Sequence, residues 1–290
     1  MQSHIAYFFL RLWVEMFRLL PFRAVHALSG AMSFVLYRLI GYRKKVVLDN
    51  LRRAFPERPE AEIRRIAEAA YLNLADITLE TFKVLTLPVP EGLRRCPYLN
   101  PEAINAHLDQ GRSVILSGSH YTNWEIACLS LGLGFRGSTV TVYKPLSNKV
   151  IDAYLNRCRS RAGMEMVSME DTYAEMRRRR DQPTVYIMLA DQSPSNARSA
   201  HWVDFLGQDT ASLPGVDVLA RKFRHPVFYL HIDRLRRGCY QARYDPLWEN
   251  PDTAAEGDIT RAFARHAEAI IRAKPAGWLW SHKRWKMRRP

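Results

Sequence analysis

Short apolar segments alternate with segments of helical periodicity along most of the chain. Four short runs rich in β-branched residues predict buried strands: residues 113–117, 139–143, 184–189 and 226–232. Helices are predicted between or beside them, at residues 126–133, 148–162 and 213–222. Alternation of strands and helices is typical of layered α/β folds, and we therefore expect a mixed-sheet α/β sandwich.

The N-terminal segment predicts a helix with a wide apolar face. In residues 5–20, the charged side chains of Arg11, Glu15 and Arg18 are spaced four and three apart, which places them on one side of a helix. Phe, Leu, Trp and Met side chains cover most of the remaining surface. Because charges interrupt the apolar run, the segment is a poor secretory signal and a poor membrane span.

A second apolar stretch follows at residues 24–40, with only His26 and Arg38 as basic side chains. Together the two stretches predict a helical hairpin that either dips into one leaflet of a membrane or packs on the protein core. The basic cluster at residues 41–45 is typical of a chain beside anionic headgroups on the cytoplasmic side. We expect membrane-anchoring helices in residues 1–45 and a second domain in residues 46–290.

The region between this hairpin and the first strand is expected to be helical and then irregular. Residues 60–85 have helical periodicity, and Pro56 and Pro59 mark the start of that helix. Residues 87–101 contain four prolines and predict a connecting segment.

The charge balance indicates a polyanionic partner. The 290 residues include 43 Lys and Arg against 29 Asp and Glu, a formal net charge of +14. Nucleic acid, anionic lipid headgroups and a phosphorylated substrate all fit this excess, and a merely soluble basic protein is the plain alternative. The four cysteines have no zinc-like spacing and predict reduced thiols without a metal site.

The segment LSGSHYTNWE, residues 116–125, contains the candidate chemistry. His120 follows the end of a buried strand, and Glu125 falls in the first turn of the next predicted helix, whose N-terminal cap is expected at Thr122 or Asn123. An imidazole can take a proton from a hydroxyl as it attacks, and a carboxylate on the other ring nitrogen holds the required tautomer. No G-x-S-x-G nucleophile is present, so we expect direct attack by an acceptor hydroxyl, with His120 as the base and Glu125 as its partner.

Other interpretations remain open at this point. His120 and Glu125 are also consistent with a satisfied loop histidine and a helix N-terminal acid, because H-x4-E arises often by chance. A thioesterase or lipase would use the same histidine, and a membrane scaffold would not use it at all. The basic runs at residues 177–180 and 283–289 would suit a nucleic-acid binder, although no recognisable nucleic-acid motif accompanies them.

Further segments resemble a known family. SGSHYTNWE is similar to the H-x4-D/E box of the lysophospholipid acyltransferase superfamily. More narrowly, the chain resembles the lipid A biosynthesis (lauroyl/myristoyl) acyltransferases over roughly residues 40–290. The similar segments are NLRRAFPE (50–57), VYKPLSNKVID (142–152), ADQSPS (190–195), TASLPGVDVLARK (210–222) and WLWSHKRWKMRRP (278–290).

The resemblance implies a function and a set of site residues. It implies a sandwich of the glycerolipid acyltransferase type on the cytoplasmic face of the inner membrane. The enzyme would transfer an acyl chain from acyl carrier protein or coenzyme A thioester to a lipid hydroxyl, with no metal, tightly bound cofactor or nucleic acid involved. The acceptor would be a lipid A precursor, or alternatively another lysolipid or an aminolipid. The implied substrate-binding residues are Asn123, Lys144, Arg157, Arg159, Arg161, Asp191 and Gln192, beside the catalytic His120 and Glu125.

Overall fold

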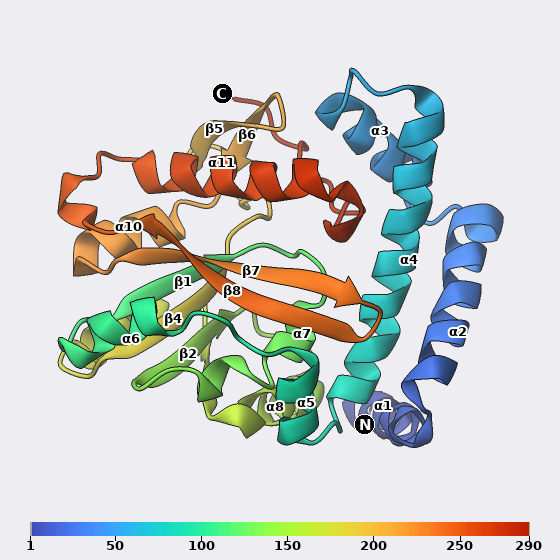
Figure 1. The fold of residues 1–290 in the computed structure, drawn as a ribbon, viewed down its shortest axis with the longest axis horizontal. Coiled ribbons are helices and arrows are strands. Elements are labelled where there is room, and N and C mark those ends of the chain that lie inside the picture. Colours follow the sequence, from blue (N-terminus) through green and yellow to red (C-terminus); the bar gives the residue numbers. More distant parts are fainter. Residues whose placement is uncertain (1, 290) are drawn as a thin grey trace.

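A six-stranded sheet forms the centre of the computed structural model, which describes residues 2–289 (Figure 1). Met1 and Pro290, the last residue of the C-terminal family-like segment, lie outside the described residues. In sheet order the strands are β3 (Met164–Ser168), β2 (Ser138–Tyr143), β4 (Thr184–Leu189), β1 (Val114–Gly118), β7 (Val227–Arg236) and β8 (Cys239–Trp248). The first five are parallel, and β8 pairs with β7 in the antiparallel direction. The predicted mixed sheet is confirmed.

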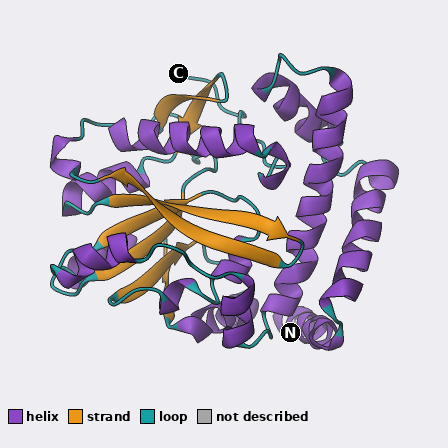
Figure 2. Ribbon diagram, in the orientation of Figure 1, coloured by secondary structure: helices purple, strands orange, loops and turns teal. Residues whose placement is uncertain are grey.

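Helices cover both faces of this sheet, as Figure 2 shows. Ile115 of β1 belongs to a buried cluster with residues of α10 (Gly215–Phe223) and α11 (Asp258–Ala273). Its neighbours Val114 and Leu116 belong to a second cluster with residues of α5 (Val89–Arg95) and α6 (Glu102–Asp109). Because successive side chains of a strand point to opposite faces, the continuous apolar run that predicted β1 fills two cores at once.

The N-terminal third of the chain forms a helical layer beside the sheet. It contains α1 (Gln2–Leu19), α2 (Phe22–Phe34), the π-helical turn η1 (Val35–Ile40), α3 (Lys44–Ala54) and α4 (Glu60–Val84). In Figure 1, α2 runs alongside α4, and the predicted helices over residues 5–20, 24–40 and 60–85 are confirmed within one or two residues at most ends. The division into residues 1–45 and 46–290 stays a prediction.

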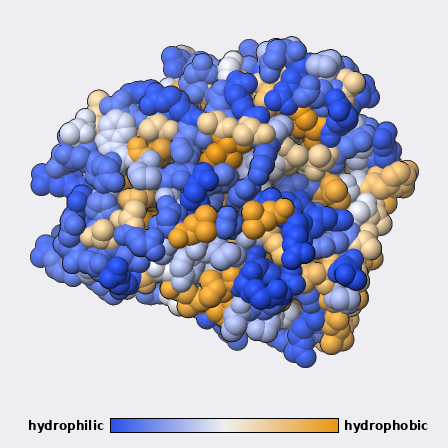
Figure 3. Space-filling model, viewed as in Figure 1, coloured by the Kyte–Doolittle hydropathy of each residue, from blue (hydrophilic) through white to orange (hydrophobic). Residues whose placement is uncertain are grey.

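The apolar side chains of α1 are divided between core and surface. Val14 and Phe17 are buried, whereas Phe8, Phe9, Leu12 and Leu19 are exposed. Figure 3 shows further apolar side chains at the surface along the right-hand edge, where Figure 1 places α2. Among the described residues, no single helix is long and apolar enough to cross a bilayer. Only Phe22–Ile40 and Lys44–Ala54 taken together reach that length and composition, and they meet at a bend of 94°.

Several elements differ from the sequence prediction. The proline-rich segment 87–101 contains α5, which begins after Pro88 and has Pro90 in its first turn, where a missing amide costs no hydrogen bond. The helix predicted at 126–133 is only α7 (Trp124–Ala127), followed by the 3-10 turn η2 (Leu131–Leu133). The unpredicted elements are β3, β8, the α9 helix (Thr172–Arg178), α5, α6, α11 and the small ribbon of β5 (His201–Phe205) and β6 (Gln208–Ser212).

Gly277 permits the C-terminal segment to pack against the loop after β1. A Cβ atom on Gly277 would lie 2.5 Å from Cζ of Tyr121. The Tyr121 ring is buried, and its hydroxyl donates to the carbonyl of Lys274 at 2.8 Å, so it has little room to move. We expect Gly277→Ala to lower the free energy of unfolding by about 1–3 kcal/mol, the usual cost of overpacking.

Urea unfolding followed by circular dichroism measures this effect. Gly215→Ala is the matched control, because an added Cβ there has no heavy atom within 4 Å. Equal stability of the two variants would show that Tyr121 and the C-terminal segment are not packed as described.

Candidate active site

Two parallel neighbouring strands bring His120 and Asp191 together. Strand β1 pairs with β4, and Gly118 lies opposite Leu189 at their carboxyl ends. Each chain continues for two residues beyond that pair and reaches His120 or Asp191. The His120 Nδ1 atom lies 2.7 Å from Oδ1 of Asp191, and the His120 backbone amide donates to Oδ2 at 2.9 Å. Functional groups of α/β sheets gather at this edge for the same topological reason.

Asp191 is a buried carboxylate whose hydrogen bonds are all supplied by the site. It is 4% exposed, and Nε1 of Trp278 also donates to its Oδ2, at 2.9 Å. Burial by itself raises the pKa of Asp191, but the His120 ring and the hydrogen bonds from His120 and Trp278 lower it, and the net pKa is below the ordinary range. Asp191 is therefore held as an anion that can orient a histidine ring.

The same contacts set the state of His120. Burial by itself lowers the pKa of His120, but the charge and hydrogen bond of Asp191 and the charge of Glu125 raise it above the ordinary value. A carboxylate only accepts hydrogen bonds, so Nδ1 of His120 carries a proton and Nε2 of the neutral ring has a lone pair that can accept one. The side-chain nitrogen of Gln192 donates to Nε2 at 3.4 Å, and the His120 ring packs against Trp124 in a T-shaped arrangement with 4.9 Å between ring centroids. The imidazole is thus arranged as a base.

Glu125 does not occupy the second ring nitrogen of His120, and this part of the sequence prediction is wrong. Its carboxylate instead forms a bidentate ion pair with Arg159 at the end of α8 (Lys149–Arg159), with nitrogen–oxygen distances of 3.0 and 2.5 Å. Asp191 already holds Nδ1, so Glu125 acts on His120 through its charge alone. The guanidinium fork matches the two carboxylate oxygens, which makes this pair both directional and strong.

Local backbone geometry fixes the turn between the two residues. Thr122 adopts the left-handed conformation with φ of 50°, which is uncommon for a β-branched residue. Its amide donates to the carbonyl of Gly277 at 2.8 Å, and its hydroxyl donates to the carbonyl of Ile232 at 2.6 Å. These bonds hold a strained conformation in place, as is common beside active sites.

Asn123 caps the start of α7 through its side chain, and its predicted contact with substrate stays a prediction. Its side-chain oxygen accepts from the amides of Glu125 and Ile126, both at 3.1 Å, which confirms the predicted helix cap. The side-chain nitrogen donates to Glu80 at 2.7 Å. Asn123 is fully buried and its amide is engaged on both sides, so it positions the helix that carries Glu125.

The remaining predicted site residues have different surroundings. Arg161 donates to the carbonyls of Val84, Leu87 and Cys158 at 2.8–3.0 Å, and its role in binding phosphate stays a prediction. Lys144 is exposed directly after β2, and Arg157 is exposed on α8, so their roles as substrate contacts stay predictions. Gln192 is brought to His120, as described above.

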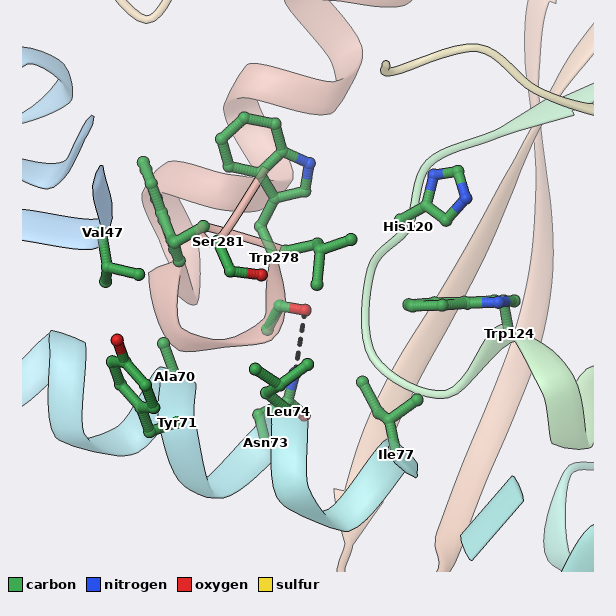
Figure 4. Close-up of a pocket in the computed structure, with 13 residues that line it drawn as sticks. Val47, Ala70, Tyr71, Asn73, Leu74, Ile77, His120, Trp124, Trp278 and Ser281 are labelled. Carbon is green, nitrogen blue, oxygen red and sulfur yellow. Dashed lines mark hydrogen bonds between the residues drawn. The ribbon is translucent and has the colours of Figure 1, made fainter. Parts of the chain in front are cut away.

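A narrow hollow leads to His120 (Figure 4). Its walls come from α3, α4, the loop after β1 and the C-terminal segment, and most of the lining is apolar. The lining residues are Val47, Ala70, Tyr71, Asn73, Leu74, Ile77, His120, Trp124, Gly277, Trp278, Leu279, Trp280 and Ser281. In Figure 4, the α4 side chains Leu74 and Ile77 lie on one side, and His120 with Trp124 on the other.

Sequence reasoning missed two features of this site. It assigned Asp191 to the acceptor site and did not pair it with His120, although both residues follow a predicted strand. It also gave Trp278 no site role, although this tryptophan holds Asp191. The only sequence signal for the pairing was that His120 and Asp191 each follow an apolar run. Such a run predicts a strand but does not indicate which strands are neighbours in the sheet. Within residues 2–289, no group of three or more His, Cys, Asp or Glu side chains is arranged to hold a metal ion.

Comparison with known proteins identifies the family of this chain. The family model described as bacterial lipid A biosynthesis acyltransferase matches residues 2–287. The lipid A biosynthesis lauroyltransferase of Escherichia coli K12 is 24% identical over 274 residues, which cover 93% of this chain and 87% of the relative. The lipid A biosynthesis acyltransferase of Haemophilus influenzae is 21% identical over 296 residues, covering 96% and 90%. The chain therefore belongs to the bacterial lipid A biosynthesis acyltransferase family.

Proposed function

We propose that this protein transfers an acyl chain from a thioester donor to a hydroxyl group of a lipid A precursor, with His120 as the general base. The observation that carries the proposal is the His120–Asp191 pair at the mouth of an apolar hollow. The pair leaves Nε2 of His120 as a proton acceptor, and most side chains that line the hollow beside it are apolar, as contact with an acyl chain requires. Another lysolipid or an aminolipid remains the alternative acceptor.

The reaction needs no covalent acyl-enzyme. The acceptor hydroxyl gives its proton to Nε2 of His120 as its oxygen attacks the thioester carbonyl carbon. The carbon–sulfur bond then breaks, and the imidazolium returns the proton to the departing sulfur. Asp191 stabilises the imidazolium between these steps. The nearby Ser119 is an unsuitable nucleophile, because it is buried and its hydroxyl pairs with Tyr229 at 2.7 Å.

Arg159 is the best-placed residue to bind a substrate phosphate. Glu125 engages its Nε and Nη2 atoms, whereas its Nη1 atom has no hydrogen-bond partner among residues 2–289. The guanidinium is partly exposed, with 23% of the side chain accessible. We propose that Glu125 fixes Arg159 so that Nη1 faces an anionic group of the substrate, since guanidinium groups suit phosphate oxygens.

The donor is proposed to be an acyl thioester of acyl carrier protein or coenzyme A. Both donors are acidic, and the net charge of +14 would steer either of them toward the enzyme. The names of the two relatives, a lauroyltransferase and an acyltransferase of lipid A biosynthesis, support a lipid acceptor of this class.

The exposed apolar face of the N-terminal helices is proposed to dock on the cytoplasmic face of the inner membrane. Phe8, Phe9, Leu12 and Leu19 of α1 are each at least 60% exposed, and Leu39 and Ile40 of η1 are similarly accessible. Soluble proteins rarely leave so many large apolar side chains in water, and an amphipathic helix buries such a face at the headgroup boundary. The basic segment 41–45 adjoins this face.

Replacing two side chains of this face should release the protein from vesicles. Phe8→Glu with Leu12→Glu removes two neighbouring apolar contacts on one side of α1, and we expect binding to anionic vesicles to weaken about tenfold or more. Vesicle sedimentation at constant salt measures the change. The control carries Tyr173→Glu and Val218→Glu, two other exposed apolar positions on α9 and α10. Equal loss in both variants would contradict docking through α1.

Acyl transfer itself is tested by mass spectrometry of defined reactions. The purified enzyme, an acyl thioester and a lipid A precursor in mixed vesicles should yield an acceptor heavier by one acyl chain, with free thiol formed in equal amount. Omitting the acceptor should stop thiol release. Rapid thiol release without acceptor would indicate a thioesterase, and absence of both products with every acceptor class would refute the proposed reaction.

A further inference from the structure

A fully buried carboxylate on α4 joins the N-terminal helices to the catalytic loop. Glu80 has no exposed surface, and donors from three separate elements surround it. His26 of α2 contacts Oε1 at 2.8 Å, whereas Asn123 and the hydroxyl of Tyr240 on β8 each contact Oε2 at 2.7 Å. A buried carboxylate is tolerated only when such partners replace water, so the three contacts depend on one another.

One end of this cluster reaches the candidate active site. Asn123 donates to Glu80 with its side-chain nitrogen and caps α7 with its side-chain oxygen. The capped amides are those of Glu125 and Ile126, and Glu125 in turn holds Arg159. The orientation of the Asn123 side chain therefore sets both the start of α7 and the position of the Glu125–Arg159 pair.

The other end of the cluster lies in the helical layer with the exposed apolar face. His26 belongs to α2, and the neighbouring side chain of Leu28 is exposed. A second buried carboxylate, Asp76, lies one helical turn earlier on α4 and binds Ser29 of α2 together with Arg234 and Arg237. Within residues 2–289, Asp76 makes no hydrogen bond to the loop after β1, so its contact with Ser29 lies in the same helix interface but does not lead to Asn123.

We propose that Glu80 is a positioning residue that couples the placement of α2 to the geometry of α7 through His26 and Asn123. Docking of the N-terminal helices on a lipid surface would then favour the arrangement in which Asn123 caps α7 and Glu125 holds Arg159. We call this series of contacts, from His26 through Glu80 and Asn123 to α7, the relay. Its effect on catalysis rests on the proposed function, whereas its effect on the structure of α7 does not.

Hydrogen exchange at the start of α7 tests the relay without substrate. His26→Leu removes the donor to Glu80, His26→Gln keeps a nitrogen donor near the Nε2 position, and Ser29→Ala alters the parallel contact. We expect amides 123–127 to exchange about tenfold faster in His26→Leu, as for a weakened helix cap, and at the original rate in His26→Gln and Ser29→Ala. Anionic phosphatidylglycerol vesicles should slow exchange of these amides in the original protein but not in His26→Leu, although α1 is protected in both.

Steady-state kinetics of the same variants distinguish a positioning role of Glu80 from a general loss of structure. His26→Leu should lower kcat about fivefold with the KM for thioester unchanged, and His26→Gln should restore it. Unchanged exchange at residues 123–127 in His26→Leu, or no effect of vesicles on these amides in the original protein, would overturn the relay. An enzyme with intact acyl transfer and no such coupling would refute only the relay. Coupling without acyl transfer to any lipid would refute only the proposed reaction.

Discussion

Replacement of His120 by alanine should lower kcat/KM for acyl transfer by about 10³-fold, within the range of about 10²–10⁴ typical of a positioned general base. The variant loses the proton acceptor at Nε2, while the hollow and the Glu125–Arg159 pair remain. Initial rates of thiol release in the presence of a lipid acceptor measure the loss. Vesicle binding and far-ultraviolet circular dichroism should be unchanged.

A second substitution excludes a trivial structural cause. His120→Asn places an amide donor near the position of Nδ1, so Asp191 keeps a partner while the base is absent. We expect the same loss of rate as in His120→Ala. Retention of more than a tenth of the original rate in either variant would mean that another group removes the proton.

Replacement of Asp191 by asparagine should lower kcat by about 10²- to 10⁴-fold and alter the pH profile. The amide supplies only one acceptor oxygen, where His120 Nδ1, the His120 amide and Trp278 now donate to a carboxylate. If the new amide nitrogen faces Nδ1, the histidine must take the other tautomer, and Nε2 then carries a proton and is no longer a base.

The sign of the pH effect follows from the raised pKa of His120. The base must be neutral to act, so activity rises with pH through that pKa, which the Asp191 charge holds above the ordinary value. Removal of this charge lowers the pKa, and the acidic limb of the kcat profile should move to lower pH even as the plateau falls. Glu125→Gln should move the limb less, because Glu125 acts on His120 only through its charge. An unmoved limb in Asp191→Asn would contradict the assignment.

Local sequence patterns were sufficient to predict the parts of the site that depend on neighbouring residues. Residues 184–189 form β4 as predicted, because an apolar β-branched run of that length suits a strand buried on both faces. The strand end before His120 and the cap at Asn123 also follow from residues within ten positions of one another. The membrane interpretation of residues 5–20 is consistent with the exposed side of α1, although Val14 and Phe17 of the same helix are core residues.

The partner of His120 could not be predicted in this way. Asp191 is 71 residues away, and the two meet only because β4 lies next to β1, whereas β2, the strand that follows β1 in sequence, lies beyond β4. Sequence proximity favoured Glu125 as this partner. However, the turn at Thr122 and the cap at Asn123 place the Glu125 carboxylate where it forms an ion pair with Arg159. Strand β8 was also missed, since Pro246 weakens the strand signal, although an edge strand tolerates proline.

The most direct test of the central claim is nitrogen-15 NMR of the His120 ring, observed across a pH titration and assigned by comparison with His120→Asn. The geometry predicts that the neutral ring carries its proton on Nδ1, that Nε2 is unprotonated, and that the ring pKa is above the ordinary histidine value and falls in Asp191→Asn. A neutral ring protonated at Nε2, or a pKa unaffected by Asp191→Asn, would contradict the assignment of His120 as a base oriented by Asp191.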